Sequence, residues 1–464
     1  MELEGSGKEL ARHSKGMRTA NMAFARNNSA FARNNRGPSM HFARRTTLSA
    51  AVVAALAGTA LPAAAQHSSP GPTRASVATD GRQADGASAE PALSANGRYI
   101  AFVSAAANLV RGDTNGVADV FVHDLRTGRT QRIAEGPATG VALSGDGRNV
   151  VFATTAALTK DDDNGLDDIY LYDRRTHRTE RISHGHPDAS PRSRLNYSPA
   201  ISANGRIVAY TTATPDAAPG DTNGRDDVIV HDRRTGKDEL VQYRTDGTLG
   251  EGDSLSASLS ADGRHVAFET ADQLDPNHDW THARNIYVRD RLKGTTEQIS
   301  RPTRFVYKQS SFDSSISANG RMFAFSSNVA SLVPDDTNKV TDVFAFDRKT
   351  QTTVRVSTAA DGTQADGVSS AASLSGDGRR VAFVSTATNL VPGDTNGLAD
   401  VFVKDLRTGA VERVSMAADG TEADRPAVGS TSLGDHRIAF SSAATNLVRG
   451  DTNDTVDVFV GPRS

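Results

Sequence analysis

Six copies of an acidic motif are the residues of this sequence that are best suited to bind a metal ion. Each copy reads Asp-x-Asn-x-x-x-Asp, so two oxygen donors alternate along the chain and a second carboxylate follows a turn. Calcium binds roughly six to eight oxygen ligands of this kind. The candidate calcium ligands are Asp113, Asn115 and Asp119; Asp162, Asn164 and Asp168; Asp221, Asn223 and Asp227; Asp336, Asn338 and Asp342; Asp394, Asn396 and Asp400; and Asp451, Asn453 and Asp457.

Two interpretations of this motif remain open. In the first, each loop holds Ca²⁺ and resembles a shortened integrin-type calcium loop, but Arg111, Pro392 and Arg449 stand where such a loop has an early carboxylate. Two carboxylates per loop are few for a strong calcium site. In the second, the Asn-Gly pair forms a turn and the Asp side chains accept hydrogen bonds from loop amides. The sequence establishes no cofactor, and Ca²⁺ is the one candidate.

A second candidate site lies where the acidic motif is lost. Residues 275–285 read Asp-Pro-Asn-His-Asp-Trp-Thr-His-Ala-Arg-Asn and contain the only tryptophan of the chain. Aromatic side chains on loops can stack on sugars or fill pockets of a partner protein. The alternatives are a packed loop without a ligand, or a zinc site whose third ligand the sequence does not identify. The candidate ligand-binding residues are Trp280, His278, His282, Phe305 and Tyr307.

No catalytic residue is assigned from the sequence. The absence of cysteine excludes a thiol nucleophile, disulfides and thiolate metal sites. Gly252-Asp253-Ser254-Leu255 spells a hydrolase-like motif, but no strand-to-helix elbow surrounds the serine. Most acidic residues are repeat copies, whereas catalysis needs an acid and a base in distinct environments.

The elements that must position these residues recur along the chain. Blocks such as Leu93–Phe102, Leu259–Phe268 and Leu374–Phe383 share the pattern Leu-Ser-x-Asn/Asp-Gly-Arg followed by alternating apolar residues. Seven copies of this block consume residues 66–464, which argues for one repeat architecture rather than several domains. Their serines are Ser94, Ser144, Ser202, Ser260, Ser317, Ser375 and Ser432.

Each repeat predicts four short strands. The first ends at Leu-Ser and turns through Asn-Gly or Asp-Gly, the strongest short hairpin signal. In the sixth repeat the next three are predicted at Arg380–Ser385, Asp400–Asp405 and Ala410–Ser415. Four strands per repeat without helical periodicity indicate a β-propeller. The long loops between the second and third strands and between repeats then lie on one face, the long-loop face, and the tight turns lie on the other.

The two ends of the repeat array are complementary. The seventh repeat stops after its third strand, at Asp457–Val460, whereas the segment Arg74–Gly86 matches Arg355–Gly367, a fourth strand with its following loop. We therefore predict an all-β fold: a single seven-bladed β-propeller of four-stranded blades. The N-terminal strand would close the ring by joining the last blade, which leaves no unpaired edge.

The run Leu93–Ser104, followed by Asp119–Asp124 and Thr127-Gly128, resembles the WD-repeat-like propeller repeat of the TolB family, and it recurs in all seven copies. The resemblance implies a secreted or envelope-associated binding scaffold, or a propeller domain used by varied enzymes. TolB itself has an additional N-terminal domain before a six-bladed propeller. Its role in the Tol system is therefore not carried over to this chain.

The N-terminal segments precede the repeats. We interpret residues 1–39 as a disordered or non-native extension and residues 40–65 as a signal peptide, with Arg44 and Arg45 before an apolar run and small residues before Gln66. Residues 66–464 form the propeller. We expect a secreted or cell-envelope-associated protein with no membrane span after signal cleavage. The net charge of −3 gives no signature of nucleic-acid binding, and we expect a monomer.

Two functions follow from this sequence. The first is a non-catalytic β-propeller that binds a protein or a glycan through its long-loop face. The alternative is an extracellular carbohydrate-active enzyme, a lyase or a hydrolase, with a pocket at the mouth of the central channel. A pocket lined by non-repeated His, Arg and carboxylates would favour the enzyme.

Overall fold

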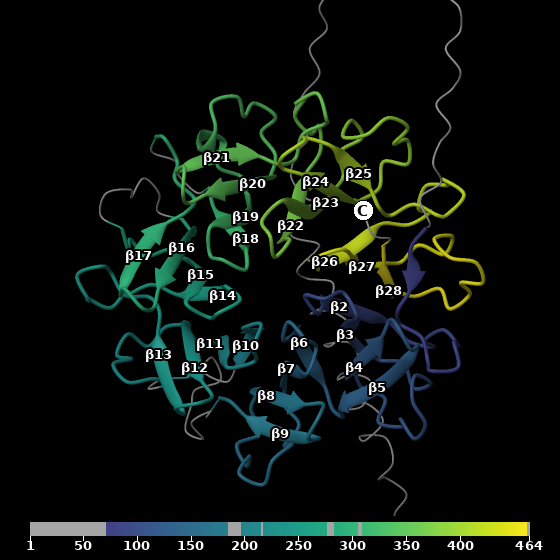
Figure 1. Ribbon diagram of the computed structural model, residues 1–464, viewed down its shortest axis with the longest axis horizontal. Helices are drawn as coiled ribbons and strands as arrows, with labels where there is room; N and C mark the ends of the chain where they lie inside the picture. Colours follow the sequence, from purple (N-terminus) through teal and green to yellow (C-terminus); the bar gives the residue numbers. More distant parts are fainter. Residues whose placement is uncertain (1–70, 184–195, 215–216, 276–282, 305–308, 462–464) are drawn as a thin grey trace, which may run out of the picture. The chain divides into compact units, whose positions relative to one another are not determined.

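The protein forms seven four-stranded antiparallel sheets. The computed structural model describes residues 71–183, 196–214, 217–275, 283–304 and 309–461. Figure 1 shows the sheets as blades of a ring, so the predicted seven-bladed β-propeller is confirmed. The helical element in these ranges is the single turn η1 (Ala330–Leu332), and within them no helix is long and apolar enough to cross a membrane.

The strands follow the repeat. Blade one contains β2 (Ser88–Leu93), β3 (Tyr99–Ser104), β4 (Asp119–Asp124) and β5 (Arg129–Ala134). Blade two contains β6 (Ala138–Leu143), β7 (Asn149–Thr154), β8 (Asp168–Asp173) and β9 (Arg178–Arg181). Blade three contains β10 (Asn196–Ile201), β11 (Ile207–Thr212), β12 (Asp227–Asp232) and β13 (Lys237–Leu240). Blade four contains β14 (Ser254–Leu259), β15 (His265–Thr270), β16 (Asn285–Asp290) and β17 (Thr295–Gln298).

Blade five contains β18 (Ser311–Ile316), β19 (Met322–Ser327), β20 (Asp342–Asp347) and β21 (Thr352–Arg355). Blade six contains β22 (Ser369–Leu374), β23 (Arg380–Ser385), β24 (Asp400–Asp405) and β25 (Val411–Arg413). Blade seven contains β26 (Ala427–Leu433), β27 (Ile438–Ser442) and β28 (Asp457–Val460), with β1 (Thr73–Arg74) as its fourth strand.

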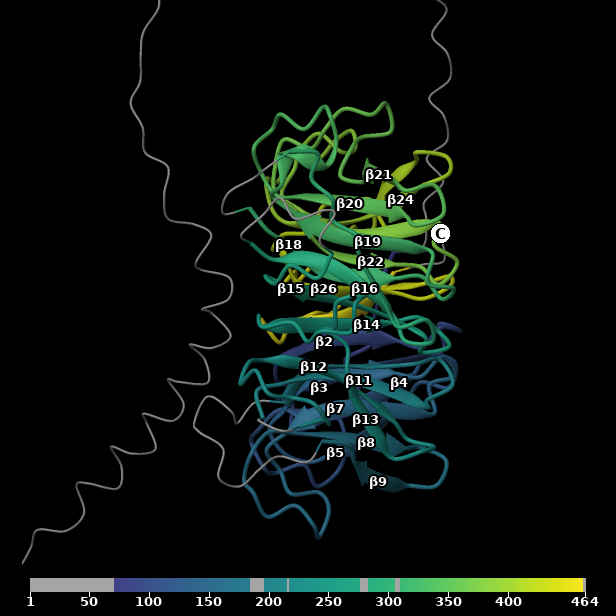
Figure 2. The same cartoon turned by 90° about the vertical axis from the view of Figure 1, so that its left-hand side faces the viewer.

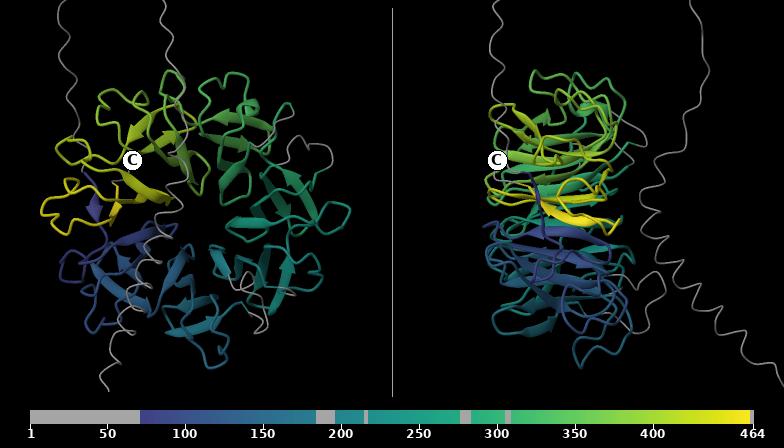
Figure 3. Two further views of the ribbon diagram at one scale, coloured as in Figure 1. Left: turned by 180° about the vertical axis from the view of Figure 1, so that it is seen from behind. Right: turned by 90° about the vertical axis from the view of Figure 1, so that its right-hand side faces the viewer.

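The second and third strands of each blade form the core. Phe102 on β3 and Phe121 on β4 stack with ring centroids 5.8 Å apart, and both are fully buried. The same cross-strand aromatic pair recurs in every blade except blade three. Apolar side chains of one blade pack against those of the next, as Val122 does with the cluster around Phe152. Figure 2 and the right-hand view of Figure 3 show the stacked blades from the side, and the left-hand view of Figure 3 shows the ring from behind.

A bulge interrupts each innermost strand. The third residue of the strand adopts a left-handed backbone conformation, as Glu90 does with φ 55°. The pairing register with the second strand shifts at this residue. The equivalent residues are Glu90, Gly140, Ser198, Ser256, Asp313, Ala371 and Gly429. The bulge leaves a backbone N–H without a ladder partner. In blade two this group, on Gly140, donates to the Glu90 carboxylate of blade one at 2.6 Å, which ties neighbouring inner strands together.

Strand β1 completes blade seven by pairing with β28, through Thr73 opposite Val460 and Arg74 opposite Phe459. The segment Arg74–Gly86 was predicted as this strand with its following loop, and the strand itself ends at Arg74. Most of the remainder forms a hairpin-like loop with an isolated bridge between Val77 and Gln83. Residues 1–70 lie outside the described ranges, so the upstream extension and the signal peptide stay predictions.

Candidate functional site

An arginine on the outermost strand contacts the carboxylates of the acidic motif in five of the six loops. This contact between the arginine and the loops was not predicted from the sequence. The pairs are Arg132 with Asp113 and Asp119; Arg181 with Asp162 and Asp168; Arg355 with Asp336; Arg413 with Asp394 and Asp400; and Arg74 with Asp451 and Asp457.

Blade six shows this arrangement most fully. Arg413 Nη1 lies 3.0 Å from Asp394 Oδ1 and 3.3 Å from Asp400 Oδ2, and it lies 2.7 Å from Glu422 Oε1. The exposed fraction of the Arg413 side chain is 5%, and those of the two aspartates are 1% and 0%. Burial raises the pKa of Asp394 and Asp400, and the guanidinium opposes this shift. The arginine therefore neutralises charges that would be costly to bury alone.

The asparagine of the motif makes the turn. In all six loops its Oδ1 accepts the backbone N–H two residues later, as Asn115 does from Val117 at 3.0 Å. Its Nδ2 donates to the last aspartate, as Asn115 does to Asp119 at 2.8 Å. The asparagine thus makes the turn, as in the second interpretation, while the hydrogen bond to the aspartate comes from the Asn side chain.

Calcium at the six loops stays a prediction. In five of them an ion would compete with a guanidinium that already contacts the carboxylates. Within the described ranges, no group of three or more His, Asp or Glu side chains is arranged to hold a metal.

Blade three departs from this pattern. Asn223 Nδ2 still donates to Asp227 Oδ1 at 3.0 Å, but Leu240 occupies the arginine position. Gln242 donates from Nε2 to the same carboxylate. Burial raises the pKa of Asp227 to about 7. Blade three thus keeps the carboxylates of the motif without the arginine that its siblings supply.

In blades one to five, the aspartate that ends the third strand pairs with the arginine of the preceding tight turn. Arg98 donates from Nε and Nη2 to both carboxylate oxygens of Asp124, at 3.1 and 2.6 Å. Equivalent pairs occur in blades two to five. In blade five the Arg321 hydrogen bond lowers the pKa of Asp347 to about 2. Because the arginine of the tight turn already binds each of these carboxylates, we assign them a structural role.

The predicted aromatic cluster falls outside the described residues. His278, Trp280, His282, Phe305 and Tyr307 all belong to the ranges 276–282 and 305–308. At the foot of the blade-four loop, Asn285 is buried and its Oδ1 accepts a hydrogen bond from Ser300 at 3.3 Å. Asparagine thus occupies the place of the last aspartate of the other loops.

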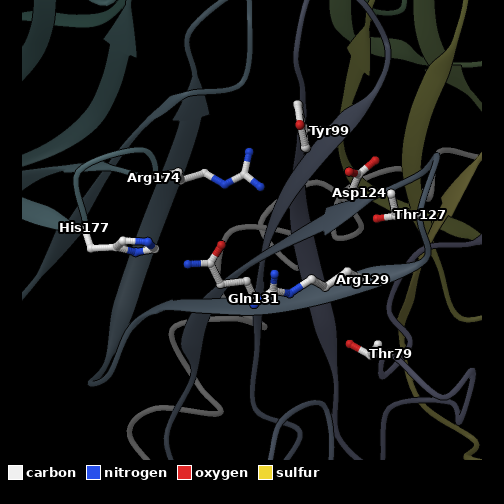
Figure 4. A pocket seen from close by; sticks show the side chains of 8 residues that line it. All are labelled: Thr79, Tyr99, Asp124, Thr127, Arg129, Gln131, Arg174 and His177. Carbon is white, nitrogen blue, oxygen red and sulfur yellow. The ribbon is translucent and has the colours of Figure 1, made fainter.

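A pocket of about 630 Å³ lies between blades one and two, at the end of blade one that carries the tight turns. Figure 4 shows its side chains, with Arg174 and His177 approaching from blade two. The lining residues are Thr79, Tyr99, Asp124, Thr127, Arg129, Gln131, Arg174 and His177.

Cationic groups dominate this pocket. The Arg174 guanidinium lies 4.2 Å from the centroid of the Tyr99 ring, and Arg98 lies 4.6 Å from it. Arg129 is exposed in the pocket wall. The one lining carboxylate, Asp124, is held by Arg98, whose hydrogen bond keeps its pKa well below the usual range. The lining therefore has an excess of positive charge and of hydrogen-bond donors, which suits an anionic ligand.

No protein-family model and no curated protein matches this chain. Among solved structures it is similar to an oligogalacturonate lyase in complex with manganese, with 12% identity, a TM-score of 0.51, and coverage of 82% of this chain and 91% of the lyase. The β-propeller domain of the Trilobed protease from Pyrococcus furiosus gives 11% identity, a TM-score of 0.51, and coverage of 81% and 95%. The fold that the chain shares with these structures is the β-propeller.

A TolB structure from Acinetobacter baumannii aligns with this propeller at 17% identity and a TM-score of 0.39, covering 68% of this chain and 63% of TolB. At such identities the similarity concerns the fold alone.

The pocket of this propeller was not predicted from the sequence, although a signal for it existed. His177 takes the position of the turn glycine of most repeats, with φ 56°, whereas the residue at the position of Tyr99 varies among the repeats. The signal of His177 lies at a tight turn, whereas the departures from the repeat that the sequence analysis used lie in the long loops.

Proposed function

We propose that this TolB-like propeller is a non-catalytic binding protein of the cell envelope or the extracellular space, and that it binds an acidic glycan in the pocket between blades one and two. The observation that supports this proposal is the cationic lining around Arg129 and Arg174. Guanidinium groups bind carboxylates with paired, charge-assisted hydrogen bonds.

The size of the pocket supports a glycan over a protein surface. Its volume of about 630 Å³ falls within the roughly 300–1,000 Å³ that is typical of small-molecule sites. Gln131, Thr127 and His177 add neutral hydrogen-bonding groups that can contact sugar hydroxyls. The acidic unit would meet the arginines, and the neutral groups would orient the ring.

The enzyme is the weaker candidate. A glycosidase uses two carboxyl groups, one of them with a raised pKa. Asp124 is the one carboxylate of this lining, and its pKa is lowered by Arg98. The similarity to a lyase at 12% identity does not transfer an activity. Binding at the long-loop face, through the residues around Trp280, stays a prediction.

The test is a glycan array that contains oligouronates and matched neutral oligosaccharides, followed by calorimetric titration of any hit. We expect binding of acidic oligomers that weakens as salt rises, because exposed charges are screened. Arg129→Ala should weaken binding about ten- to a hundredfold, in line with a lost hydrogen bond to a charged group. Arg126→Ala is the matched control, because Arg126 lies in the same turn outside the lining.

Two results would overturn the proposal. One is an equal affinity of the parent and Arg129→Ala for the acidic oligomer. The other is binding that Trp280→Ala abolishes and Arg129→Ala leaves unchanged, which would place the site on the long-loop face.

A further inference from the structure

Blade three carries a substitution that changes the charge balance of its acidic loop. Leu240 stands opposite Ile229, the register position that Arg413 holds opposite Phe402 in blade six. The exposed fraction of Leu240 is 4%, and it packs with Val208 and Ile229. The loop keeps both carboxylates of the motif, Asp221 and Asp227, with exposed fractions of 6% and 1%.

A second substitution places a buried amide at the same carboxylate. Where blade six has Ser415, whose hydroxyl donates to Asp400 at 2.5 Å, blade three has Gln242. Gln242 is fully buried, and its Nε2 donates to Asp227 Oδ1. Among the described residues, Gln242 Oε1 and Asp227 Oδ2 have no hydrogen-bond partner. A buried polar oxygen without a partner is costly, which points to a ligand beside it.

We propose that blade three binds one hard divalent cation, Ca²⁺, through the carboxylates of Asp221 and Asp227 and the amide oxygen of Gln242. The ion would take the place of the guanidinium in the sibling blades. These oxygen donors are the type that Ca²⁺ prefers, and water can complete the coordination shell. This site is separate from the pocket between blades one and two, so it goes beyond the proposed function.

The proposal restricts calcium to one blade. In blade six, Arg413 Nη1 contacts both Asp394 and Asp400. The guanidinium therefore occupies the position between the two carboxylates that a calcium ion would take. The same guanidinium is present in blades one, two, five and seven. We therefore expect one calcium ion per chain rather than six.

The experiment measures calcium stoichiometry by equilibrium dialysis and the melting temperature during CaCl₂ titration, with MgCl₂ in parallel. The parent should bind one Ca²⁺, and its melting temperature should rise with concentration, because only the folded state binds. Leu240→Arg and Asp227→Asn should each reduce the stoichiometry to zero. Asp227→Asn removes a ligand with little change in volume, so it tests the site even where Leu240→Arg fails to fold.

The sibling blade supplies the matched control. The double variant Arg413→Leu with Ser415→Gln transfers the two blade-three residues to blade six, and its stoichiometry should rise to two. Three results would overturn the proposal: no binding by the parent, binding by Leu240→Arg that equals that of the parent, or a graft that stays at one. A melting temperature that responds to pH near neutrality and not to Ca²⁺ would also overturn it, because the carboxylates would then share a proton.

Discussion

Replacing Arg413 with leucine is expected to destabilise the propeller strongly at alkaline pH. The substitution removes a guanidinium that contacts Asp394, Asp400 and Glu422, and it leaves two carboxylates buried without that cation. Both side chains are at most 1% exposed, so water cannot replace the arginine without local opening. Removing one partner of a buried ion pair costs about 3–5 kcal/mol.

The corresponding change in melting temperature follows from the size of the domain. The 366 described residues give an unfolding entropy of roughly 0.8 kcal/mol per kelvin, so the loss corresponds to about 4–6 °C. The assay is thermal unfolding at pH 8 in the presence of a chelator, which prevents a metal ion from replacing the arginine. Adding Asp394→Asn and Asp400→Asn to the same variant should recover part of the loss, because the uncompensated charges are then absent.

The pH dependence gives an independent check. Burial raises the folded-state pKa of Asp394 and Asp400 above the unfolded value, and this shift increases without the arginine. A carboxyl group whose pKa is higher in the folded state stabilises the fold at pH values below its unfolded-state pKa. This stabilisation is lost as the pH rises through the folded-state pKa. The variant should therefore approach the parent as pH falls from 8 to 5. A variant that melts within about 1 °C of the parent at pH 8 would refute this account.

Three further predictions concern the turns and the ring. Lys339 has φ 64° where four of the sibling loops have glycine, so Lys339→Gly should raise the free energy of unfolding by about 0.5–1 kcal/mol. Gly397→Lys should lower it similarly, and urea unfolding measures both. Arg321 lowers the pKa of Asp347 to about 2, so the small stabilisation that this solvent-screened pair adds above pH 4 is lost as pH falls through 2. The parent should therefore melt slightly above Asp347→Asn at pH 7 and not at pH 2, and a difference in melting temperature that persists at pH 2 would contradict this. Deleting residues 66–86 removes β1 and exposes the edge of β28, so the variant should aggregate or melt well below the parent in light-scattering and calorimetric scans; an unchanged melting temperature would exclude this pairing.

The sequence by itself determined the architecture, because the signals for it are local. Alternating apolar residues and Asn-Gly or Asp-Gly turns define strands and hairpins without knowledge of distant partners. The predicted strands Arg380–Ser385 and Asp400–Asp405 coincide with β23 and β24. The predicted fourth strand, Ala410–Ser415, is shortened to Val411–Arg413, because strand ends depend on pairing as well as on residue type.

The tertiary structure decided the roles of the charged residues. Arg413 and Asp400 are 13 residues apart, and their contact depends on the register of β25 against β24. Ser76 and Asp457 are 381 residues apart and meet because β1 joins the last blade. Similarly, the pocket around Tyr99 and Arg174 arises because two blades approach each other in space. A motif specifies which atoms can bind a cation, whereas the packing of neighbouring strands decides whether an arginine is already bound there.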